Sequence, residues 1–388
     1  MEFSEDSDHQ AIRSAIRTIC AQFPDEYWAE ADATHTFPWA FYRAMADGGW
    51  LGVAIPAEYG GSGAGITAAS VVLEEVAASG ACMNGASAIH MSIFGMQPVV
   101  LHGSIELKQR YLPRVATGDL HVAFGVTEPD AGLDTTAIST RGVRDGDGYR
   151  VTGRKVWTSK ALESERVLLL VRTTALADCA HRTDGLTLLV ASLRDPAVSI
   201  RPIRKLGRNA VASCEVTYDG LYVAESDRVG QEGSGFRYLL DGLNAERVLI
   251  AAEAIGIGRA ALRRAAAYAS DRVVFGRPIG ANQGVSFPLA AAHARLAAAE
   301  LVTQQAAWRI DHELPSGEQA NTAKFLAAEA GFAAADAALQ THGGFGYATE
   351  YHVERYWREA RLLRIAPVPQ EMALNYLAEH VLGLPRSY

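Results

Sequence analysis

Cysteine is scarce in this chain of 388 residues, where it occurs only as Cys20, Cys82, Cys179 and Cys214. None of the four forms a Cys-x-x-Cys pair or lies near a histidine at the spacing of metal ligands, so we expect no metal site. Scattered cysteines in a chain of this length are typical of reduced thiols in a cytosol. The chain is therefore expected to be cytoplasmic, with its thiols reduced.

Basic residues are also in short supply. Lys and Arg number 36 against 44 Asp and Glu, which gives a net charge of -8 and a pI of about 5.8. Binding to nucleic acid needs clustered basic residues, so we do not expect nucleic acid as the main partner. No uninterrupted apolar run reaches about 18 residues, and the acidic first residues do not resemble a signal peptide. We therefore expect no membrane span.

The chain is long enough, and at 49% hydrophobic apolar enough, to bury a large core in two or three units. Apolar residues first recur at helical spacing. Short segments rich in Val, Thr, Leu and Ile then follow, with the hairpin signal Asp145-Gly146-Asp147-Gly148, before long alanine-rich stretches. The sequence predicts an α+β fold with an N-terminal helical domain (1–119), a middle β-domain of antiparallel strands (120–235) and a C-terminal four-helix bundle (236–388).

Small residues and hydroxyls crowd together between Phe124 and Asp134, directly after an alternating apolar run. Thr127 and Gly132 belong to this segment, and the lack of bulk lets backbone N–H groups approach a flat or anionic ligand. An ordinary loop that satisfies its polar groups through Asx and hydroxyl turns gives the same pattern. Motifs elsewhere in the chain are needed to distinguish a ligand-binding loop from an ordinary surface loop.

Three further motifs follow in order along the chain. They are Gly153-Arg154-Lys155-Val156-Trp157-Thr158-Ser159-Lys160, then Arg272-Val273-Val274-Phe275-Gly276-Arg277-Pro278-Ile279 with Gln283, then Gln340-Thr341-His342-Gly343-Gly344-Phe345-Gly346-Tyr347. Taken singly, they fit a strand with one buried Trp, a connection between helices and a helix C-cap. Taken together, in this α, β, α order, they resemble the acyl-CoA dehydrogenase family of flavoproteins over nearly the whole chain.

The resemblance implies an FAD site with two halves. The flavin half comprises Phe124, Val126, Thr127, Gly132, Trp157 and Ser159, where backbone donors would stabilise developing negative charge. The diphosphate and adenosine half is implied to come from a neighbouring subunit and comprises Arg272, Phe275, Gln283, Gln340, Gly343 and Gly344. At least a dimer follows, and the family's usual state is a homotetramer. Leu133 stands where the family usually has a serine that touches the FAD pyrophosphate, so this chain lacks that donor.

The resemblance also implies a catalytic carboxylate, which takes a proton from the α-carbon of an acyl-CoA thioester. Most of the family carries a glutamate at the position that Pro367 holds here. A minority, including isovaleryl-CoA and long-chain dehydrogenases, has it before an arginine on another helix, where this chain has Glu246 before Arg247. We expect Glu246 to be the base, with Leu243, Asn244 and Arg247 at the substrate.

Two structural alternatives to this assignment remain open. Glu246 could pair with Arg247 or with a neighbouring helix and have no catalytic part. Glu371 is a competing carboxylate, but in the first turn of the last helix the helix dipole already favours it. A nearby run of Arg and Glu, from Glu354 to Arg361, is interpreted as a solvated or ion-paired helix face.

The expected function is FAD-dependent α,β-dehydrogenation of a short or branched acyl-CoA to the 2-enoyl-CoA, with hydride passing to flavin N5. An electron-transferring flavoprotein is the acceptor that the resemblance implies. No dinucleotide fingerprint follows a strand, so NAD is not expected. The alternatives are oxidation of a carrier-protein thioester, flavin monooxygenase chemistry, and a flavin-binding subunit without activity.

Overall fold

Helices build the first third of the chain. The computed structural model describes residues 6–386, and its first seven α-helices are α1 (Ser7–Cys20), α2 (Asp25–Thr34), α3 (Trp39–Asp47), α4 (Gly65–Val76), α5 (Cys82–Phe94), α6 (Gln97–His102) and α7 (Ile105–Ala116). Ser104 caps α7, because its hydroxyl accepts a hydrogen bond from the backbone N–H of Leu107. Every residue of α5 is buried, so this helix forms the centre of the domain rather than an amphipathic face.

Strands occupy the middle of the chain and form one sheet. They are β1 (Val122–Gly125), β2 (Arg141–Asp145), β3 (Gly148–Ser159), β4 (Arg166–Arg172), β5 (Leu186–Ser192), β6 (Val198–Pro202), β7 (Ser213–Ala224) and β8 (Arg228–Val229). The strand order is β6-β7-β3-β2-β4-β5-β8, with β1 beside β4. The predicted hairpin is confirmed, since Asp145 of β2 pairs with Gly148 of β3. The sheet is mainly antiparallel, but β1 runs parallel to β4.

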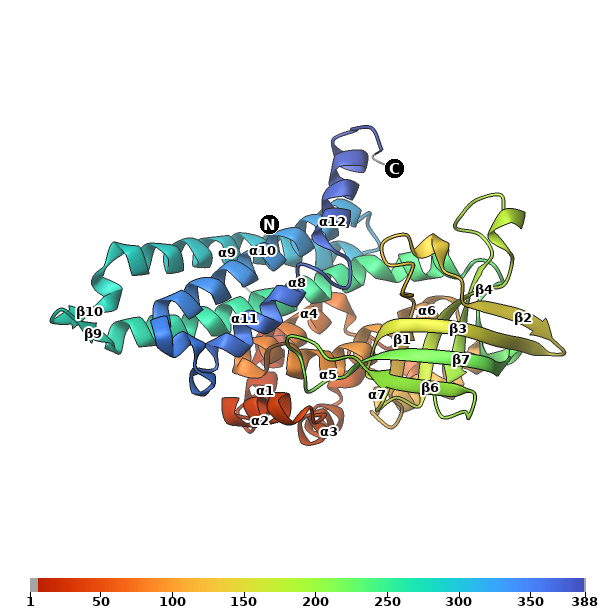
Figure 1. Cartoon of the computed structure of the whole chain (residues 1–388), viewed down its shortest axis with the longest axis horizontal. Coiled ribbons are helices and arrows are strands. Elements are labelled where there is room, and N and C mark those ends of the chain that lie inside the picture. The colour runs from red at the N-terminus through yellow and green to blue at the C-terminus, as the bar shows by residue number, and fades with distance from the viewer. Residues whose placement is uncertain (1–5, 387–388) are drawn as a thin grey trace.

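Long helices return after the sheet. They are α8 (Gly235–Asp271), α9 (Gln283–Asp311), α10 (Gly317–His342), α11 (Val353–Leu362) and α12 (Gln370–Tyr376), and a hairpin of β9 (Val273–Val274) and β10 (Arg277–Pro278) joins α8 to α9. Figure 1 shows α8, α9 and α10 lying side by side, with this hairpin at the opposite end of the molecule from the sheet. Pro369 is the N-cap of α12.

The predicted α+β fold class, with helical, β and helical domains in this order, is confirmed. The boundaries drawn at 119 and 235 stay a prediction. The helix α8 joins the domains, since it packs against α4 and α5 as well as α9 and α10. A glycine is required at Gly256, because a Cβ there would lie 2.4 Å from the carbonyl oxygen of Glu74 on α4.

The charged run on α11 is buried or half-buried rather than solvated. Arg355 is 1% exposed and donates to the carbonyl of Gly80 and to the Asp25 carboxylate, the latter at 2.9 Å. Glu359 is fully buried and accepts from both the backbone and the side chain of Asn84. The ion-paired alternative is therefore the correct one, and these pairs fasten α11 to the N-terminal helices.

Two helical stretches are long and apolar enough to cross a membrane by length and composition alone. The first runs from Gly65 to His102, and 89% of its apolar window is buried inside the protein. The second is α9, where only 17% of the apolar window is buried, and Phe287, Leu301 and Trp308 are exposed on it. The sequence expectation considered uninterrupted apolar runs only. By mean hydropathy, two helical stretches among the described residues pass the test for a membrane span. The first of them is protein core, and α9 presents an exposed apolar face.

Candidate active site

The loop after β1 is tied down by a buried carboxylate. Glu128 accepts hydrogen bonds from the backbone N–H groups of Ser139 at 2.7 Å and Thr140 at 2.9 Å. The Lys155 ammonium donates to Glu128 at 2.8 Å and to the carbonyl of Val126 at 2.9 Å. Burial alone would raise the pKa of the Glu128 carboxyl, but the Lys155 charge and these donors lower it to about 2. The segment is thus a fixed loop, rather than one held only by its own turns.

Phe124, Val126 and Thr127 are each half-buried at the start of this loop, and Gly132 lies exposed beyond it. The carbonyl of Thr127 accepts from the backbone N–H of Val156 at 2.9 Å, which joins the loop to β3. The loop and the second sequence motif are therefore neighbours in space, as predicted.

Trp157 and Ser159 take their positions from an irregularity in β3. The register with β7 shifts between Lys155 and Thr158, and Trp157 adopts a φ of +61°. Its indole ring is consequently 56% exposed instead of buried within the sheet. The hydroxyl of Ser159 accepts a hydrogen bond from the guanidinium of Arg208 at 3.0 Å. Arg208 itself has a φ of +58°, a conformation that bulky residues rarely adopt away from functional sites.

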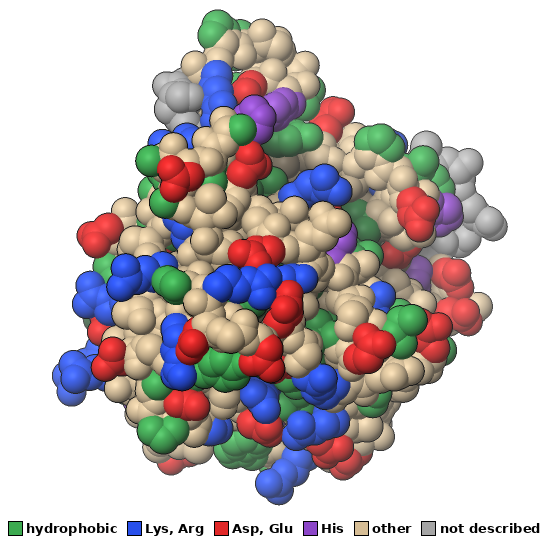
Figure 2. All heavy atoms as spheres, turned by 90° about the vertical axis from the view of Figure 1, so that its right-hand side faces the viewer, with side chains coloured by type: hydrophobic (Ala, Val, Ile, Leu, Met, Phe, Trp, Pro, Cys, Tyr) green, Lys and Arg blue, Asp and Glu red, His purple; other side chains and the backbone are tan. Residues whose placement is uncertain are grey.

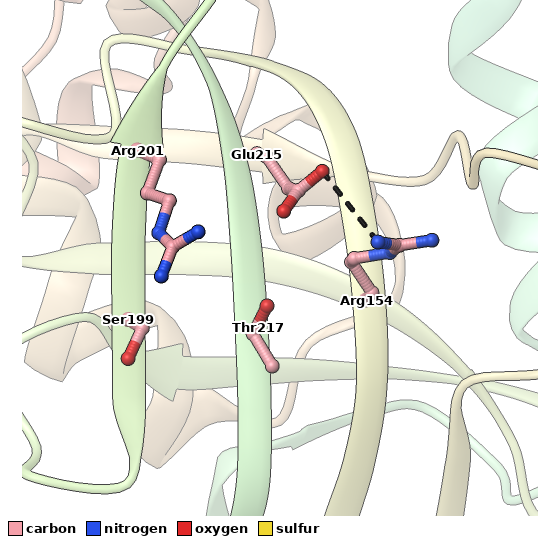
Figure 3. Close-up of a pocket in the computed structure, with 5 residues that line it drawn as sticks. All are labelled: Arg154, Ser199, Arg201, Glu215 and Thr217. Carbon is pink, nitrogen blue, oxygen red and sulfur yellow. Dashed lines mark ion pairs between the residues drawn. The ribbon is translucent and has the colours of Figure 1, made fainter.

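Lys155 and its neighbour Arg154 point to opposite faces of the sheet, as the alternation of a strand requires. Lys155 is buried, whereas Arg154 lies on the outer face, 3.8 Å from Glu215. Figure 3 shows that face, where a shallow surface pocket is lined by Arg154, Ser199, Arg201, Glu215 and Thr217. In the view of Figure 2, which looks onto the end of the molecule opposite the β9–β10 hairpin, acidic and basic side chains are interspersed and no large patch of one sign forms.

The residues predicted for the second half of the FAD site gather at the other end of the molecule. The guanidinium of Arg272 lies over the ring of Phe345, which brings the third and fourth motifs together. The predicted residues here are all exposed, namely Arg272, Phe275, Gln283, Gln340, Gly343 and Gly344. The β9–β10 hairpin that carries Phe275 lies at the opposite end of the molecule from β3, the strand that carries Trp157 (Figure 1). One chain alone therefore does not bring the two predicted halves together.

The exposed groups nevertheless fit FAD. Trp157 offers an aromatic face, and Phe275 is fully exposed at the tip of its hairpin. A Cβ added at Gly132, Gly343 or Gly344 would meet no atom within 4 Å, so the backbone at all three faces open space. Open backbone amides of this kind suit a phosphate, and an exposed ring suits a flavin or an adenine.

Glu246 is buried on α8 and hydrogen-bonded to a histidine. Its Oε2 lies 2.6 Å from Nε2 of His90 on α5, and Nδ1 of His90 lies 2.7 Å from Oε1 of Glu253, two turns further along α8. The three side chains are 6%, 6% and 0% exposed respectively. Burial would lower the pKa of His90, but the two carboxylates raise it to about 10. The imidazole is therefore held in its charged form between two carboxylates.

Glu246 does not hydrogen-bond to Arg247. The guanidinium of Arg247 donates instead to Asn244 at 3.0 Å, and Asn244 in turn approaches the hydroxyl of Ser316 at 3.4 Å. Burial lowers the pKa of Arg247, although the charge of Glu246 opposes this. Glu246 does pair with a neighbouring helix, because it hydrogen-bonds to His90 on α5. It is also buried, as expected of a base.

The other two positions considered for the base are exposed. Pro367 lies in the turn between α11 and α12, and Glu371 lies in the first turn of α12. Neither is enclosed by the protein as Glu246 is. Leu243 and Asn244, predicted to contact the substrate, are half-buried one turn before Glu246 on α8.

An aromatic contact joins Glu246 to the loop after β1. The ring of His90 is 5.8 Å from that of Phe94, and the ring of Phe94 is 5.9 Å from that of Phe124. The ring of Phe94 therefore lies between His90, which holds Glu246, and the predicted flavin contact Phe124.

Sequence reasoning did not single out His90, Glu253 or Arg208. His90 lies in the apolar stretch Ser87-Ala88-Ile89-His90-Met91, where a lone histidine is inconspicuous. The available signal was the spacing of Glu246 and Glu253, because residues seven apart share a helix face and a second glutamate on a buried face needs a partner.

Comparison with known proteins was made on the whole chain. Three family models match in succession: the acyl-CoA dehydrogenase N-terminal domain over residues 6–119, the middle domain over 123–221 and the C-terminal domain over 233–382. FadE12 of Mycobacterium tuberculosis (strain H37Rv), an acyl-CoA dehydrogenase, is 38% identical, and the match covers 100% of this chain and 99% of FadE12.

Two further similarities extend over the same length. A 3-(aryl)acrylate reductase of Clostridium sporogenes is 32% identical over 98% of this chain and 100% of the relative. The solved structure of a glutaryl-coenzyme A dehydrogenase in complex with glutaryl-CoA superposes with a TM-score of 0.95 at 29% identity, covering 100% of this chain and 98% of that one. On these matches the chain belongs to the acyl-CoA dehydrogenase family, and is an FAD-dependent oxidoreductase that acts on acyl-CoA thioesters.

Proposed function

We propose that Glu246 is the base that removes the α-proton of the acyl-CoA. Its burial and its hydrogen bond to His90 support this assignment, because they fix one carboxylate oxygen and keep water away. Among the described residues, Oε1 has no hydrogen-bond partner and remains for the substrate. The proton of the α-carbon goes to this oxygen, and the product is the 2-enoyl-CoA. FAD held at the loop after β1 and Trp157 would supply the acceptor for the hydride of the β-carbon.

We also propose that Pro367 stands where most of the family carries its base. Proline has no group that accepts a proton, so the role has to pass to another carboxylate. Glu371 is the nearest candidate in sequence, but it is exposed at the start of α12. Glu371 is thus open to solvent, whereas Glu246 is enclosed between α5 and α8.

Rapid anaerobic mixing of the FAD-loaded enzyme with acyl-CoAs tests the assignment. Bleaching of the oxidised flavin band reports the reaction. Glu246→Gln should slow flavin reduction by about 10²–10⁴-fold, which is the range for loss of a general base. Glu371→Gln is the matched control and should stay within about threefold of the parent enzyme. Flavin reduction at a near-parent rate in the Glu246 variant, with FAD still bound, would rule out Glu246 as the base.

The proposed substrate carries a short or branched acyl chain. Phe94 supports this, because its ring fills the space beside Gly242, where an added Cβ would lie 3.5 Å from the ring. A bulky ring between α5 and the start of α8 leaves little depth for a long chain. The same mixing experiment separates the alternatives. Bleaching only with a carrier-protein thioester would indicate oxidation of that thioester instead. Turnover that needs oxygen would indicate a flavin monooxygenase. No bleaching with any thioester would indicate a flavin-binding subunit without activity.

We further propose a homotetramer in which each FAD contacts two chains. Two features support this arrangement: the predicted FAD residues lie at opposite ends of one chain (Figure 1), and α9 exposes an apolar face. An exposed apolar face on a long helix is typical of an interface between subunits. The proposed electron acceptor is an electron-transferring flavoprotein, from the family resemblance. The proposed location is the cytoplasm, from the scattered cysteines.

A further inference from the structure

The ring of His90 joins two carboxylates through both of its nitrogens. The distances, 2.6 Å to Glu246 and 2.7 Å to Glu253, are those of strong hydrogen bonds between charged partners. Ionised carboxylates only accept hydrogen bonds, so each of the two contacts needs one proton between nitrogen and oxygen. The chain Glu246–His90–Glu253 therefore holds two protons, and its net charge is −1.

The charged groups around this chain are few. On α8 the neighbouring cation is Arg247, which acts on Glu246, and from the loop before β7 Arg208 acts on Glu253. The helix α5 contributes no charged residue besides His90 itself. The second oxygen of Glu253 is buried with no hydrogen-bond partner among the described residues. The state of Glu246 thus depends chiefly on His90 and, behind it, on Glu253.

We propose that His90 is a positioning residue that keeps Glu246 ionised and correctly oriented, and that Glu253 fixes the ring of His90 from its other nitrogen. This inference rests on the proposed function of Glu246 as the base. A carboxylate buried without a cation is more stable when protonated, and a protonated carboxylate cannot take the substrate proton. The charge of His90, whose pKa the two carboxylates raise to about 10 despite burial, prevents that loss.

The proton balance of the reaction follows. Before the reaction, the chain holds two protons and a charge of −1. The proton from the α-carbon binds to Oε1 of Glu246, which brings the chain to three protons and no net charge. After the product leaves, Glu246 returns this proton to water and the chain regains its charge. At low pH the third proton is already present, and flavin reduction stops.

The acid limit is the pH below which flavin reduction stops. Replacing His90 and replacing Glu253 should move this limit in opposite directions. His90→Gln keeps a hydrogen-bonding side chain but removes the positive charge, so Glu246 should take up a proton at a higher pH. Glu253→Gln removes a negative charge behind His90, so Glu246 should take up a proton at a lower pH. We expect each limit to move by at least about one pH unit, since the charges are buried within hydrogen-bond distance.

The experiment follows flavin reduction by saturating butyryl-CoA in the FAD-loaded enzyme, anaerobically, between pH 5 and pH 9. His102→Gln is the matched control. His102 also pairs with a carboxylate of α8, Asp241 at 2.8 Å, but this pair is partly exposed and contacts neither Glu246 nor Glu253. The control should leave the acid limit within about 0.3 pH unit of the parent value, as an exposed pair does.

Opposite shifts in the two variants support the inference, because damage to packing alone would not give opposite signs. Shifts of the same sign, or no shift in either variant, overturn it. If His90→Gln does not retain FAD, the sign of the Glu253→Gln shift decides by itself. Glu246→Gln separates the two proposals. Near-parent flavin reduction in that variant overturns the assigned base. If Glu246→Gln abolishes flavin reduction but the acid limit does not move in the His90 and Glu253 variants, only the role of His90 is overturned.

Discussion

Replacing Glu128 by glutamine removes the charge that holds the loop after β1. The carboxylate receives two backbone N–H groups and the ammonium of Lys155, and it is only 4% exposed. Lys155 is fully buried, so the substitution leaves a buried positive charge without its counter-ion. We expect Glu128→Gln to lower the free energy of unfolding and to weaken the binding of FAD, because the loop carries Val126 and Thr127.

The size of the effect follows from two independent estimates. Loss of one partner from a buried ion pair costs about 3–5 kcal/mol. The pKa of the Glu128 carboxyl is lowered from 4.5 to about 2, and at about 1.4 kcal/mol for each unit this corresponds to about 3 kcal/mol of stability at neutral pH. Both give about 3 kcal/mol, which is a large part of the stability of an ordinary domain.

The sign of the pH dependence is fixed by the same shift. The folded state binds the Glu128 proton more weakly than the unfolded state does. The contribution is therefore complete above a pH of about 4.5 and disappears as the pH falls through about 2. The difference between the parent enzyme and Glu128→Gln should accordingly be constant from pH 6 to pH 8. It should shrink as the solution is acidified below about pH 4.5.

Urea unfolding at several pH values, followed by tryptophan fluorescence and by FAD release, measures this difference. Glu165→Gln is the control, because Glu165 pairs with Arg114 at 3.1 Å on the surface, where such a pair contributes less than about 1 kcal/mol. A double variant with Lys155→Met should recover most of the loss, since it removes the unpaired charge as well. A loss in Glu128→Gln no larger than that in the Glu165 control would refute the reasoning.

Two further predictions concern substrate and assembly. Phe94→Ala should extend the acyl chains that reduce the flavin by two or more carbons, as measured by kcat/KM across a series of acyl-CoAs, and an unchanged optimum would mean that Phe94 does not limit the pocket. Arg272→Ala should lower the FAD content of purified protein while leaving its mass in solution unchanged, as measured by flavin absorbance and light scattering. Undiminished FAD would place the diphosphate elsewhere.

The fold and the loop after β1 could be predicted because their signals are local. The hairpin at Asp145 to Gly148 and the crowded small residues around Thr127 need only short stretches of sequence. The parallel pairing of β1 with β4 was missed, because it joins residues about forty positions apart and turn signals do not report it. The charged run on α11 allowed two readings, since a helix surface pattern does not show what packs against it.

The histidine on α5 was missed for a different reason. A helix that is buried on every side has no polar face against which one histidine stands out. Its two partners lie on α8, more than 150 positions away in sequence. Only the packing of α5 against α8 brings the three groups together, so the chain Glu246–His90–Glu253 is a property of tertiary structure.

A base on α8 is held differently from one in the turn after α11. The turn that contains Pro367 is exposed, and a side chain there depends on the local backbone for its position. The helix α8 spans 37 residues and packs against α4, α5, α9 and α10, so it moves only with the whole core. A carboxylate on α8 therefore gains rigidity, but burial then threatens its charge. The positive charge of His90 on the neighbouring helix α5 stabilises the ionised carboxylate. We therefore expect a glutamate at this position of α8 to need a cation such as His90 beside it.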